Sequence, residues 1–341
     1  MIKEFLPRLL RGEHLTREET GAAVRAMMRG EVGDAQIAAF LFALAQRGET
    51  ADEMLGGAEA LRAEAVPFPS ARPTLLDTCG TGGDSSHTYN ISTAAALVAA
   101  AAGVAVAKHG NRSVSSRSGS ADVLEALGAK IDLGPEGASR ALEETGFTFL
   151  NARRFHPAMR HVARARTDLG VRTLFNWLGP LSNPARATHQ LLGVADGRRT
   201  AMVAEVLARL GTTRALVVHG TGGMDELSLE EGNLAVEAGP NGAGKPCTIE
   251  ARSIGLPPAG ISALQGGDPG TNAAIIRAVL SGERGPKRDA LVLNAAAALW
   301  IAGAAPSLME GAGLAAEQID SRRALHVLDR FVALSGKLGD A

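Results

Sequence analysis

Three short apolar runs in this chain each lead into a glycine-bearing or cationic turn, and this repeated order constrains the fold more than any other feature. A short strand, a polar loop and then a helix is the rhythm of α/β proteins, in which helices flank a central, mostly parallel sheet. In open parallel sheets, ligands collect where strands end and helices begin, so the turns of neighbouring strands are expected to open on one crevice. The runs and their turns are residues 74–77 before 80–84, 104–107 before 108–112, and 215–219 before 220–226.

Residues 1–66 carry a different pattern, which predicts a small all-helical domain. Capping boxes at residues 16–19 and 50–53 mark two helix starts, because each threonine hydroxyl accepts from a glutamate amide while the glutamate side chain reaches back. Apolar residues recur at three-to-four spacing over residues 35–47, which indicates a helix between them. Three prolines between residues 67 and 73 cannot continue a helix, so we place a domain boundary there.

The composition disfavours several classes of function. The chain has 341 residues, with 36 acidic and 35 basic side chains, a net charge of −1 and 4% aromatic residues. No global field therefore draws it to nucleic acid or to an anionic membrane, and aromatic residues are too scarce for a stacking platform. Cys79 and Cys247 are too far apart in the sequence for a disulfide framework or a zinc site, which indicates a reducing compartment.

The sequence shows no targeting or membrane signal that we recognise. The first eight residues include an acid, and a proline interrupts their apolar patch. The longest apolar run, residues 94–107, is shorter than the roughly 20 residues that span a bilayer. We expect a soluble cytoplasmic protein with small-molecule substrates and with no nucleic-acid or membrane partner.

The turn at residues 80–84, Gly-Thr-Gly-Gly-Asp, has two interpretations. Its glycines let consecutive amides approach an anion such as phosphate, and the next helix presents its positive end near residues 90–93. The alternative is an ordinary tight turn between a strand and a helix. A dinucleotide-binding fold is disfavoured, because its fingerprint requires glycine where this chain has Ser85. A second glycine-rich segment, residues 239–246, ends in proline instead of the hydroxyl of a Walker loop and is predicted to be a surface turn.

Residues 108–120 form a cationic, hydroxyl-rich segment after the second predicted strand. A multiply charged phosphate ligand requires cations and small hydroxyl donors. The alternative is a solvated loop, and residues 120–128 are predicted to form a capped helix, so some hydroxyls would bond backbone amides instead. The cations are Lys108, Arg112 and Arg117, and the hydroxyls belong to Ser113, Ser115, Ser116, Ser118 and Ser120.

Residues 153–172 carry six arginines against one acid, Asp168. Arginine matches carboxylates and phosphates in two-point contacts, so one or two of these residues are candidates for binding a planar acid. Most of the others are expected to be solvated. His156 and His161 are spaced one residue too far apart for a helical metal-binding pair, so neither is predicted to bind zinc.

Asp225 and Glu226, at the end of the third predicted strand, are the strongest candidates for metal binding. Hard oxygen ligands beside a glycine-rich turn suit Mg²⁺, which is commonly held by one or two carboxylates together with substrate phosphates. Two adjacent acids are also common on protein surfaces, and that is the alternative. The anion-friendly turns elsewhere in the chain favour the metal.

Taken in order along the chain, these motifs closely resemble those of the anthranilate phosphoribosyltransferases. The resemblance runs from the N-terminal helices almost to the C-terminus, and so many ordered motifs make it specific. The motifs are Gly80–Asp84, Asn90–Thr93, Lys108–Ser113, Ser118–Asp122, His156–Arg166, Gly170–Thr173, Asn176, Gly179–Pro180, Asn183–Pro184, Asp225–Glu226, Gly266–Asp268, Asn272–Ala273 and Asn294–Ala296.

The resemblance implies a fold, an activity and an assembly. Residues 1–66, joined by helices from about 167–190, would form a small all-α domain; residues 74–166 and 191–341 would form the α/β domain that binds phosphoribosyl pyrophosphate. The active site would lie between them, and the helical domains would pair in a homodimer. The implied reaction is Mg²⁺-dependent attack of the anthranilate amine on C1 of phosphoribosyl pyrophosphate. Its products are N-(5-phosphoribosyl)anthranilate and diphosphate, in the second step from chorismate to tryptophan.

The resemblance also implies roles for individual residues, none of them as a covalent nucleophile. Two Mg²⁺ ions per active site are expected, one in contact with Ser92 and the other held by Asp225 and Glu226. The residues implied to hold phosphoribosyl pyrophosphate are Gly80, Gly82, Gly83, Asp84, Thr88, Asn90, Ser92, Thr93, Lys108 and Ser120. Those implied to face anthranilate or to shape its entry are Gly80, His109, Asn111, His156, Arg166, Gly179 and Pro180.

Three positions depart from the family pattern. Ser85 stands where glycine is frequent, Tyr89 where phenylalanine is usual, and Trp177 where a smaller aliphatic residue is common. Ser85 matters most, since a glycine-only backbone angle there would strain the turn. Two alternative functions stay open. One is a pyrimidine nucleoside phosphorylase of the same fold group, which would need no metal carboxylates; the other is a non-catalytic relative that binds nucleic acid through residues 153–172.

Overall fold

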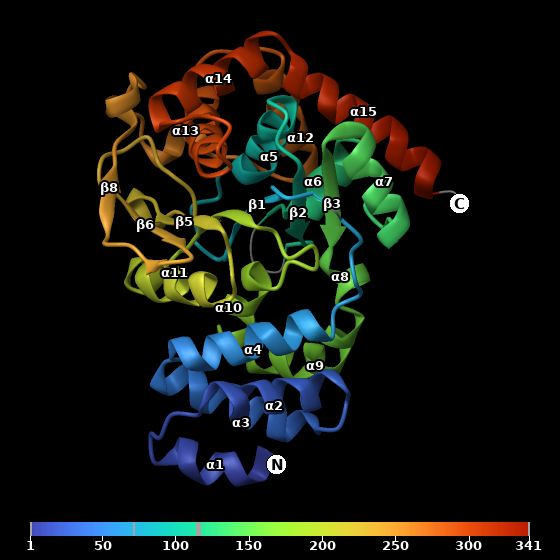
Figure 1. Cartoon of the computed structure of the whole chain (residues 1–341), viewed down its shortest axis with the longest axis vertical. Coiled ribbons are helices and arrows are strands. Elements are labelled where there is room, and N and C mark those ends of the chain that lie inside the picture. Colours follow the sequence, from blue (N-terminus) through green and yellow to red (C-terminus); the bar gives the residue numbers. More distant parts are fainter. Residues whose placement is uncertain (1, 71, 114–116, 340–341) are drawn as a thin grey trace.

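The computed structural model describes residues 2–70, 72–113 and 117–339. The molecule has a helical end and a larger α/β body (Figure 1). This arrangement confirms the predicted fold class, a small all-α part beside an α/β part with a mostly parallel sheet. Ser115 and Ser116, which the sequence indicates as hydroxyl donors, lie outside the described residues.

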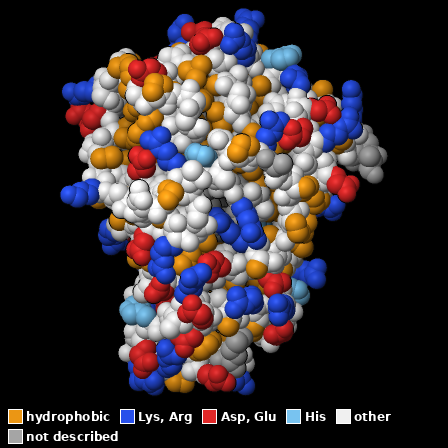
Figure 2. All heavy atoms as spheres, viewed as in Figure 1, with side chains coloured by type: hydrophobic (Ala, Val, Ile, Leu, Met, Phe, Trp, Pro, Cys, Tyr) orange, Lys and Arg blue, Asp and Glu red, His pale blue; other side chains and the backbone are white. Residues whose placement is uncertain are grey.

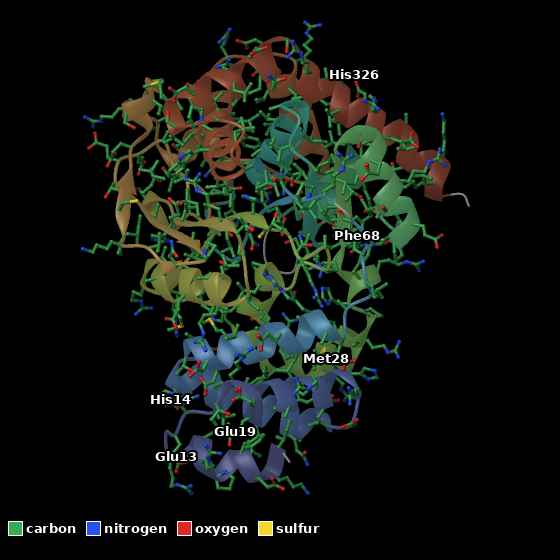
Figure 3. The ribbon with its side chains drawn as sticks, viewed as in Figure 1. Glu13, His14, Glu19, Met28, Phe68 and His326 are labelled. Carbon is green, nitrogen blue, oxygen red and sulfur yellow. The ribbon has the colours of Figure 1, made fainter. Side chains whose placement is uncertain are left out.

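The helical end contains the four N-terminal helices and two helices from the middle of the chain. Both predicted capping boxes are present. In the first, the Glu19 amide donates to Thr16 Oγ1 at 3.2 Å, and the Thr16 amide donates to Glu19 Oε2 at 2.9 Å; Figure 3 labels Glu19 in this end of the molecule. The helices are α1 (Ile2–Leu10), α2 (Arg17–Met28), α3 (Asp34–Arg47), α4 (Ala51–Ala63), α9 (Arg160–Leu169) and α10 (Leu174–Leu181).

Within the described residues, eight strands form one sheet in the order β3-β2-β1-β4-β5-β6-β7, with β8 paired to β6. The five strands from β3 to β5 in that order run parallel, and β6 is antiparallel to β5. The strands are β1 (Leu76–Gly80), β2 (Val106–Gly110), β3 (Phe147–Asn151), β4 (His189–Gly193), β5 (Arg214–His219), β6 (Asn233–Gly239), β7 (Gly242–Ala243) and β8 (Cys247–Ile249).

The first two strands extend further toward their carboxyl ends than the apolar runs predict. β1 pairs with β4 as far as Gly80, and β2 pairs with β3 as far as Gly110. Lys108 and His109 therefore lie inside β2, although the sequence places them in the following loop. The apolar pattern misses this extension because Lys108 is a charged residue with only 2% of its surface exposed.

Helices cover both faces of the sheet, with α5 and α13 on one face and α11 on the other (Figure 1). The Ala-rich sequence of α5 lets it pack closely, and nine of its residues are buried. The helices of the body are α5 (Ile91–Ala101), α6 (Ser120–Ala126), α7 (Pro135–Thr145), α8 (Ala152–Phe155), α11 (Thr200–Arg209), α12 (Pro269–Leu280), α13 (Pro286–Ile301), α14 (Leu308–Asp320) and α15 (Arg323–Gly339).

Buried apolar side chains form two clusters, and one of them crosses from the helical end into the body. The first cluster lies between the sheet and the helices on the α5 side. The second joins Phe40 and Leu178 of the helical end to Leu192 of β4 and Leu207 of α11. The linker also packs on the body, where the Phe68 ring (Figure 3) meets Phe155 edge-on with centroids 6.3 Å apart. The two parts are therefore held together by apolar packing.

The surface agrees with two of the expectations from sequence. Acidic and basic side chains are interspersed on the face that Figure 2 shows. The glycine-rich segment before Pro246 forms the β6–β7 hairpin, and residues 241–245 are exposed, which confirms a surface turn. Among the described residues, we find no helix with the length and apolar character needed to cross a membrane.

Candidate active site

The turns that follow β1 and β5 meet at the carboxyl edge of the sheet. The Gly82 amide donates to Asp225 Oδ2 at 2.6 Å. A Cβ atom at Gly80 would collide with the same oxygen, so any larger residue there would displace the Asp225 carboxylate. Gly193 of the intervening strand β4 is constrained more tightly, because its Cβ would collide with the Asp225 backbone carbonyl. The first and third turns of the sequence therefore share one site.

Glu226 connects the third turn to the start of α5. The Ser92 amide donates to Glu226 Oε1 at 2.9 Å, and Thr88 Oγ1 donates to Glu226 Oε2 at 3.2 Å. Amides in the first turn of a helix have no partner within the helix and attract anions. The Glu226 carboxylate occupies this anion-binding position.

Lys108 brings the second strand to the same point. Its Nζ donates to Thr78 O and, at 3.3 Å, to Ser92 Oγ. Burial lowers the pKa of Lys108, and the nearby Asp77 carboxylate opposes that shift. The carboxyl ends of β1, β2 and β5, from which the three turns begin, therefore converge on one centre, as expected where parallel strands end.

Three carboxylates crowd this centre. Burial raises the pKa of Asp225 and of Glu226, and repulsion by neighbouring carboxylates, including Asp84, raises both further. A divalent cation would relieve this repulsion, and oxygen ligands of this kind suit Mg²⁺. No group of three His, Cys, Asp or Glu side chains among the described residues is arranged to hold a metal, so substrate or water oxygens would complete the coordination.

The glycine-rich turn contains backbone strain. Gly82 and Gly83 both have φ of 70°, where glycine is favoured. Ser85 has φ of 59° and His87 has φ of 52°, a left-handed conformation that costs an L-residue roughly 1–2 kcal/mol. The strain expected at Ser85 is therefore present. His87 adds a second strained position that the sequence did not indicate.

Asn90 ties the start of α5 to two distant segments. Its Oδ1 accepts from Ser118 Oγ at 3.2 Å and from Asn272 Nδ2 at 2.9 Å. Thr93 lies inside the first turn of α5, fully buried, and its hydroxyl has no hydrogen-bond partner among the described residues. The structure thus brings Asn90 to the edge of the site and encloses Thr93 behind it.

The loop after β2 is ordered mainly by its own hydrogen bonds. Ser120 Oγ lies 3.5 Å from Asn111 O at the start of α6. Arg112 forms ion pairs with Asp122 at 3.2 Å and with Glu125 at 2.6 Å. Of the cations predicted for a phosphate ligand, Arg112 is therefore already neutralised by acids of the next helix.

A second group of side chains lies where the helical end meets the sheet. The rings of His109 and His156 have centroids 5.1 Å apart, and His156 Nε2 lies 3.0 Å from Ser182 O. Burial lowers the pKa of His156 to about 4. Burial and then the charge of His156 lower the pKa of His109, which also bonds the Gly179 backbone. Both imidazoles are therefore neutral at pH 7.

Arg166 of α9 is set apart from the other arginines of its segment. Its guanidinium carbon lies 5.5 Å from the centroid of the Phe175 ring, and burial lowers its pKa. No described acid forms an ion pair with it, whereas the exposed Arg164 lies 3.7 Å from Asp168. A half-buried guanidinium without an anionic partner is suited to bind a carboxylate ligand.

Comparison with known proteins decides the family. Residues 3–65 match the model of the glycosyl transferase family helical bundle domain, and residues 72–325 match that of the family a/b domain. The anthranilate phosphoribosyltransferase of Moorella thermoacetica is 50% identical over 98% of each chain. The chain belongs to the anthranilate phosphoribosyltransferase family. It is a glycosyltransferase, and the resemblance seen in its motifs is confirmed.

Solved structures of anthranilate phosphoribosyltransferases have the same fold. The crystal structure from Thermus thermophilus is 50% identical, with a TM-score of 0.92 over 97% of this chain and 99% of that chain. The Saccharomyces cerevisiae enzyme in complex with PRPP (phosphoribosyl pyrophosphate) and Mg is 26% identical, with a TM-score of 0.91 over 98% of both chains. The same yeast enzyme in complex with 4-fluoroanthranilate gives a TM-score of 0.89.

In this member of the anthranilate phosphoribosyltransferase family, Arg172 makes a contact that the sequence did not indicate. Its Nη1 donates to Gly82 O at 2.8 Å, and its guanidinium carbon lies 5.5 Å from the centroid of the Trp177 ring. Arg172 thereby joins the helical end to the glycine-rich turn. Nothing in the arginine-rich segment distinguishes it from its neighbours.

The sequence assigned no role to Asp77, and it indicated Asn183 only as part of a family motif. Asp77 is fully buried; its Oδ1 accepts from the His109 amide at 3.2 Å and its Oδ2 from Asn183 Nδ2 at 2.8 Å. Burial raises the pKa of Asp77 to about 6. The available signal was an acid at the end of an apolar run. The structure shows that this acid holds the His109 backbone amide.

Proposed function

We propose that this chain transfers the phosphoribosyl group of phosphoribosyl pyrophosphate to the amine of anthranilate, releasing diphosphate, in the second step from chorismate to tryptophan. The observation that carries the proposal is the double contact of the Asp225–Glu226 pair, one carboxylate with the glycine-rich turn and the other with the start of α5. A single centre therefore offers anion-binding amides and cation-binding carboxylates. The ligands of the yeast relative, PRPP, Mg and 4-fluoroanthranilate, support the choice of substrates.

The diphosphate would bind at the glycine-rich turn and the start of α5. The amides of Gly82 and Ser92 are engaged by Asp225 and Glu226. A diphosphate that accepted from these amides would release both carboxylates for a cation, so one exchange of partners prepares both binding sites. The residues proposed to hold phosphoribosyl pyrophosphate are Gly80, Gly82, Gly83, Asp84, Thr88, Asn90, Ser92, Thr93, Lys108 and Ser120.

Asp225 and Glu226 would hold one Mg²⁺ ion, and Ser92 would contact a second. Bound magnesium supplies positive charge that stabilises the departing diphosphate. Lys108 would add a fixed cation on the same side, since its Nζ already reaches Ser92 Oγ. Fixed charges aimed at developing negative charge are often the largest contribution to catalysis.

The anthranilate amine is itself a usable nucleophile, so no side chain needs to form a covalent intermediate. The C1–N bond forms as the bond from C1 to the diphosphate oxygen breaks, and the amine loses a proton. Arg166 would hold the anthranilate carboxylate so that the amine points at C1. The other residues proposed to face anthranilate are Gly80, His109, Asn111, His156, Gly179 and Pro180.

We also propose the domain limits and the assembly. Residues 1–66 with helices from about 167–190 would form one domain, and residues 74–166 with 191–341 the other. Leu10 of α1 and Phe42 of α3 are large apolar side chains that are 83% and 53% exposed. A cytoplasmic homodimer joined through the helical ends would cover them. Sedimentation should give twice the 35.1 kDa of one chain, and a monomer would contradict this assembly.

Loss of anthranilate fluorescence tests the proposed reaction. We expect the signal to fall only when phosphoribosyl pyrophosphate and Mg²⁺ are both present, and to stay constant after a chelator is added. Phosphorolysis of thymidine without consumption of anthranilate would instead indicate a nucleoside phosphorylase.

A further inference from the structure

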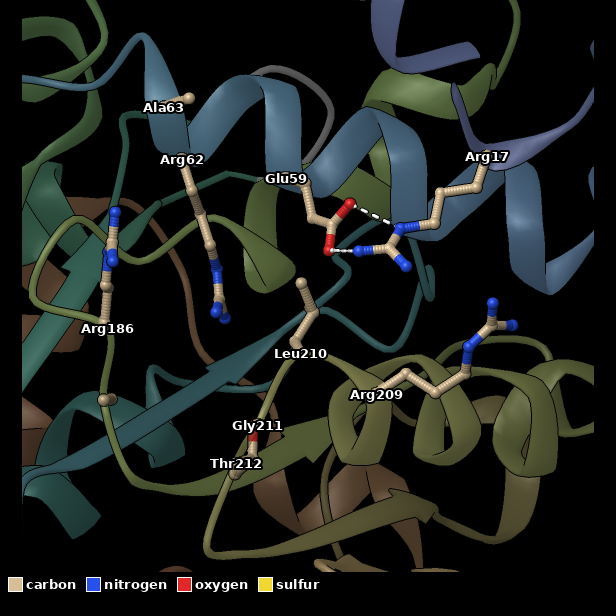
Figure 4. A pocket seen from close by; sticks show the side chains of 10 residues that line it. Arg17, Glu59, Arg62, Ala63, Arg186, Arg209, Leu210, Gly211 and Thr212 are labelled. Atoms are coloured by element: carbon tan, nitrogen blue, oxygen red, sulfur yellow. Dashed lines mark hydrogen bonds and ion pairs between the residues drawn. The ribbon is translucent and has the colours of Figure 1, made fainter. Parts of the chain in front are cut away.

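A cavity of about 500 Å³ lies between α4, the loop before β4 and the end of α11 (Figure 4). Two of its lining residues, Ala187 and Thr212, lie two residues before the first residues of β4 and β5. The cavity therefore lies at the amino edge of the sheet. The candidate active site lies at the opposite, carboxyl edge. The charged residues that line the cavity are Arg17, Glu59, Arg62, Arg186 and Arg209.

Two of the four arginines are already neutralised by acids. Arg17 Nε donates to Glu59 Oε2 at 2.7 Å, a contact drawn in Figure 4. Arg209 forms ion pairs with Asp52 at 2.6 Å and with Glu205 at 3.3 Å. The uncompensated positive charge of the cavity therefore belongs to the other two arginines.

Arg62 and Arg186 lie close to each other without an anion between them. Arg62 donates only through Nε, to Leu181 O at 2.7 Å, and the Arg186 guanidinium has no partner among the described residues. Figure 4 shows the Arg62 side chain extending from α4 into the cavity, with Arg186 beside it. Burial and then the charge of Arg186 lower the pKa of Arg62 to about 10. Arg62 is half-buried and Arg186 is exposed at the mouth of the cavity. An anion bound between them would relieve the repulsion that acts on Arg62.

We propose that this cavity binds a small phosphate monoester through the paired guanidinium groups of Arg62 and Arg186. A phosphate monoester carries about −1.5 to −2 charges at pH 7, which matches two cations, whereas a single carboxylate would leave one of them uncompensated. Guanidinium groups bind phosphate in two-point contacts. The cavity is larger than a phosphate group, so the organic part of the ester would lie against Ala63 and Leu210.

Arg186→Gln is the decisive variant because it removes one of the two charges without breaking an existing ion pair. Arg62→Gln is less suitable alone, since it also removes the hydrogen bond to Leu181 O at the end of α10. Arg198→Gln is the matched control, because its side chain is 89% exposed and is paired with Asp196 outside the cavity.

The experiment is a calorimetric titration of the full chain with inorganic phosphate. We expect a saturable step in the wild type and in Arg198→Gln that weakens about tenfold or more in Arg186→Gln, through the loss of a charge-assisted contact. Crystals soaked in phosphate should show density between Arg62 and Arg186. Unchanged phosphate binding in Arg186→Gln, or phosphate density only at the candidate active site, would overturn the proposal.

Discussion

The two halves of the candidate active site are held in place by different kinds of contact. On the side of the glycine-rich turn, Asp225 and Glu226 accept hydrogen bonds from backbone amides of other segments. On the helical side, His109 Nε2 and His156 Nδ1 are buried without a hydrogen-bond partner among the described residues, and Arg166 has no acid beside it. In the first half, the protein's own groups pair both carboxylates, and the buried Thr93 hydroxyl is left unpaired behind them. The second half leaves the functional groups themselves, two imidazole nitrogens and a guanidinium, without such partners.

This difference indicates which half depends on substrate for its final arrangement. Carboxylates bonded to amides are ordered before any ligand arrives, and a change there should affect the chemical step. Burying an unpaired guanidinium or imidazole group costs free energy, and a ligand that supplies a hydrogen-bond partner offsets that cost. Changes on the helical side should therefore act on anthranilate binding and on stability.

Glu226→Gln should cause the largest effect. We expect kcat/KM to fall by about 100- to 1,000-fold, because the neutral amide can no longer balance a cation that stabilises the diphosphate. The free energy of unfolding should not decrease, since the variant removes a buried charge. Steady-state kinetics and urea unfolding measure the two quantities, with Glu231→Gln as the exposed control in the same segment. Equal losses of activity in Glu226→Gln and Glu231→Gln would contradict a role of Glu226 in the chemical step.

The pH dependence of stability should report on His156. Its pKa is about 4 in the folded protein against 6.5 when exposed, so the unfolded chain binds the proton more readily. The contribution of His156 to the free energy of unfolding is complete above pH 6.5. It declines as the pH falls toward 4, by about 3 kcal/mol in all. Urea unfolding of the wild type and of His156→Gln between pH 7.5 and 4 should show the difference between them shrinking by that amount. A difference that is independent of pH would contradict the buried neutral imidazole.

Arg166→Ala should raise the KM for anthranilate by roughly 10- to 100-fold, the loss of a charge-assisted hydrogen bond of about 1.5–3 kcal/mol. The KM for phosphoribosyl pyrophosphate should stay nearly constant. Arg164→Ala is the matched control, because Arg164 lies on the same helix with its side chain 80% exposed. Equal increases in both KM values would contradict the assignment of Arg166 to anthranilate binding.

Arg172→Gln should have the smallest effect. It removes a contact that joins the helical side of the site to the glycine-rich turn. Loss of the bond to Gly82 O removes about 0.5–1.5 kcal/mol, so we expect the KM for phosphoribosyl pyrophosphate to rise about two- to tenfold. The KM for anthranilate should change less. Partial recovery in Arg172→Lys would show that the contact acts through charge and reach.

The sequence predicted the fold class and the convergence of the three turns, because those features are encoded locally. Glycine-rich turns after apolar runs have few structural alternatives, and parallel strands bring their carboxyl ends together. It did not separate Arg164 from Arg166. Residues two apart on a helix point about 200° apart, so only the packing of α9 decides which one faces Phe175.

Contacts between distant segments account for what the sequence missed. The hydrogen bond from Arg172 to Gly82 and the network of Asp77 with Asn183 join residues that no local pattern relates. The strain at His87, with φ of 52°, was missed because no glycine or turn motif marks that position in the sequence. The individual roles of the site residues stay predictions.

The apolar cluster that includes Leu178 of α10 and Leu207 of α11 makes the two lobes mutually dependent for folding. A truncated chain that began near residue 72 would present the uncovered side of α11 and β5 to water. Such a fragment would tend to aggregate, so the α/β part should not fold stably when it is produced without the helical end.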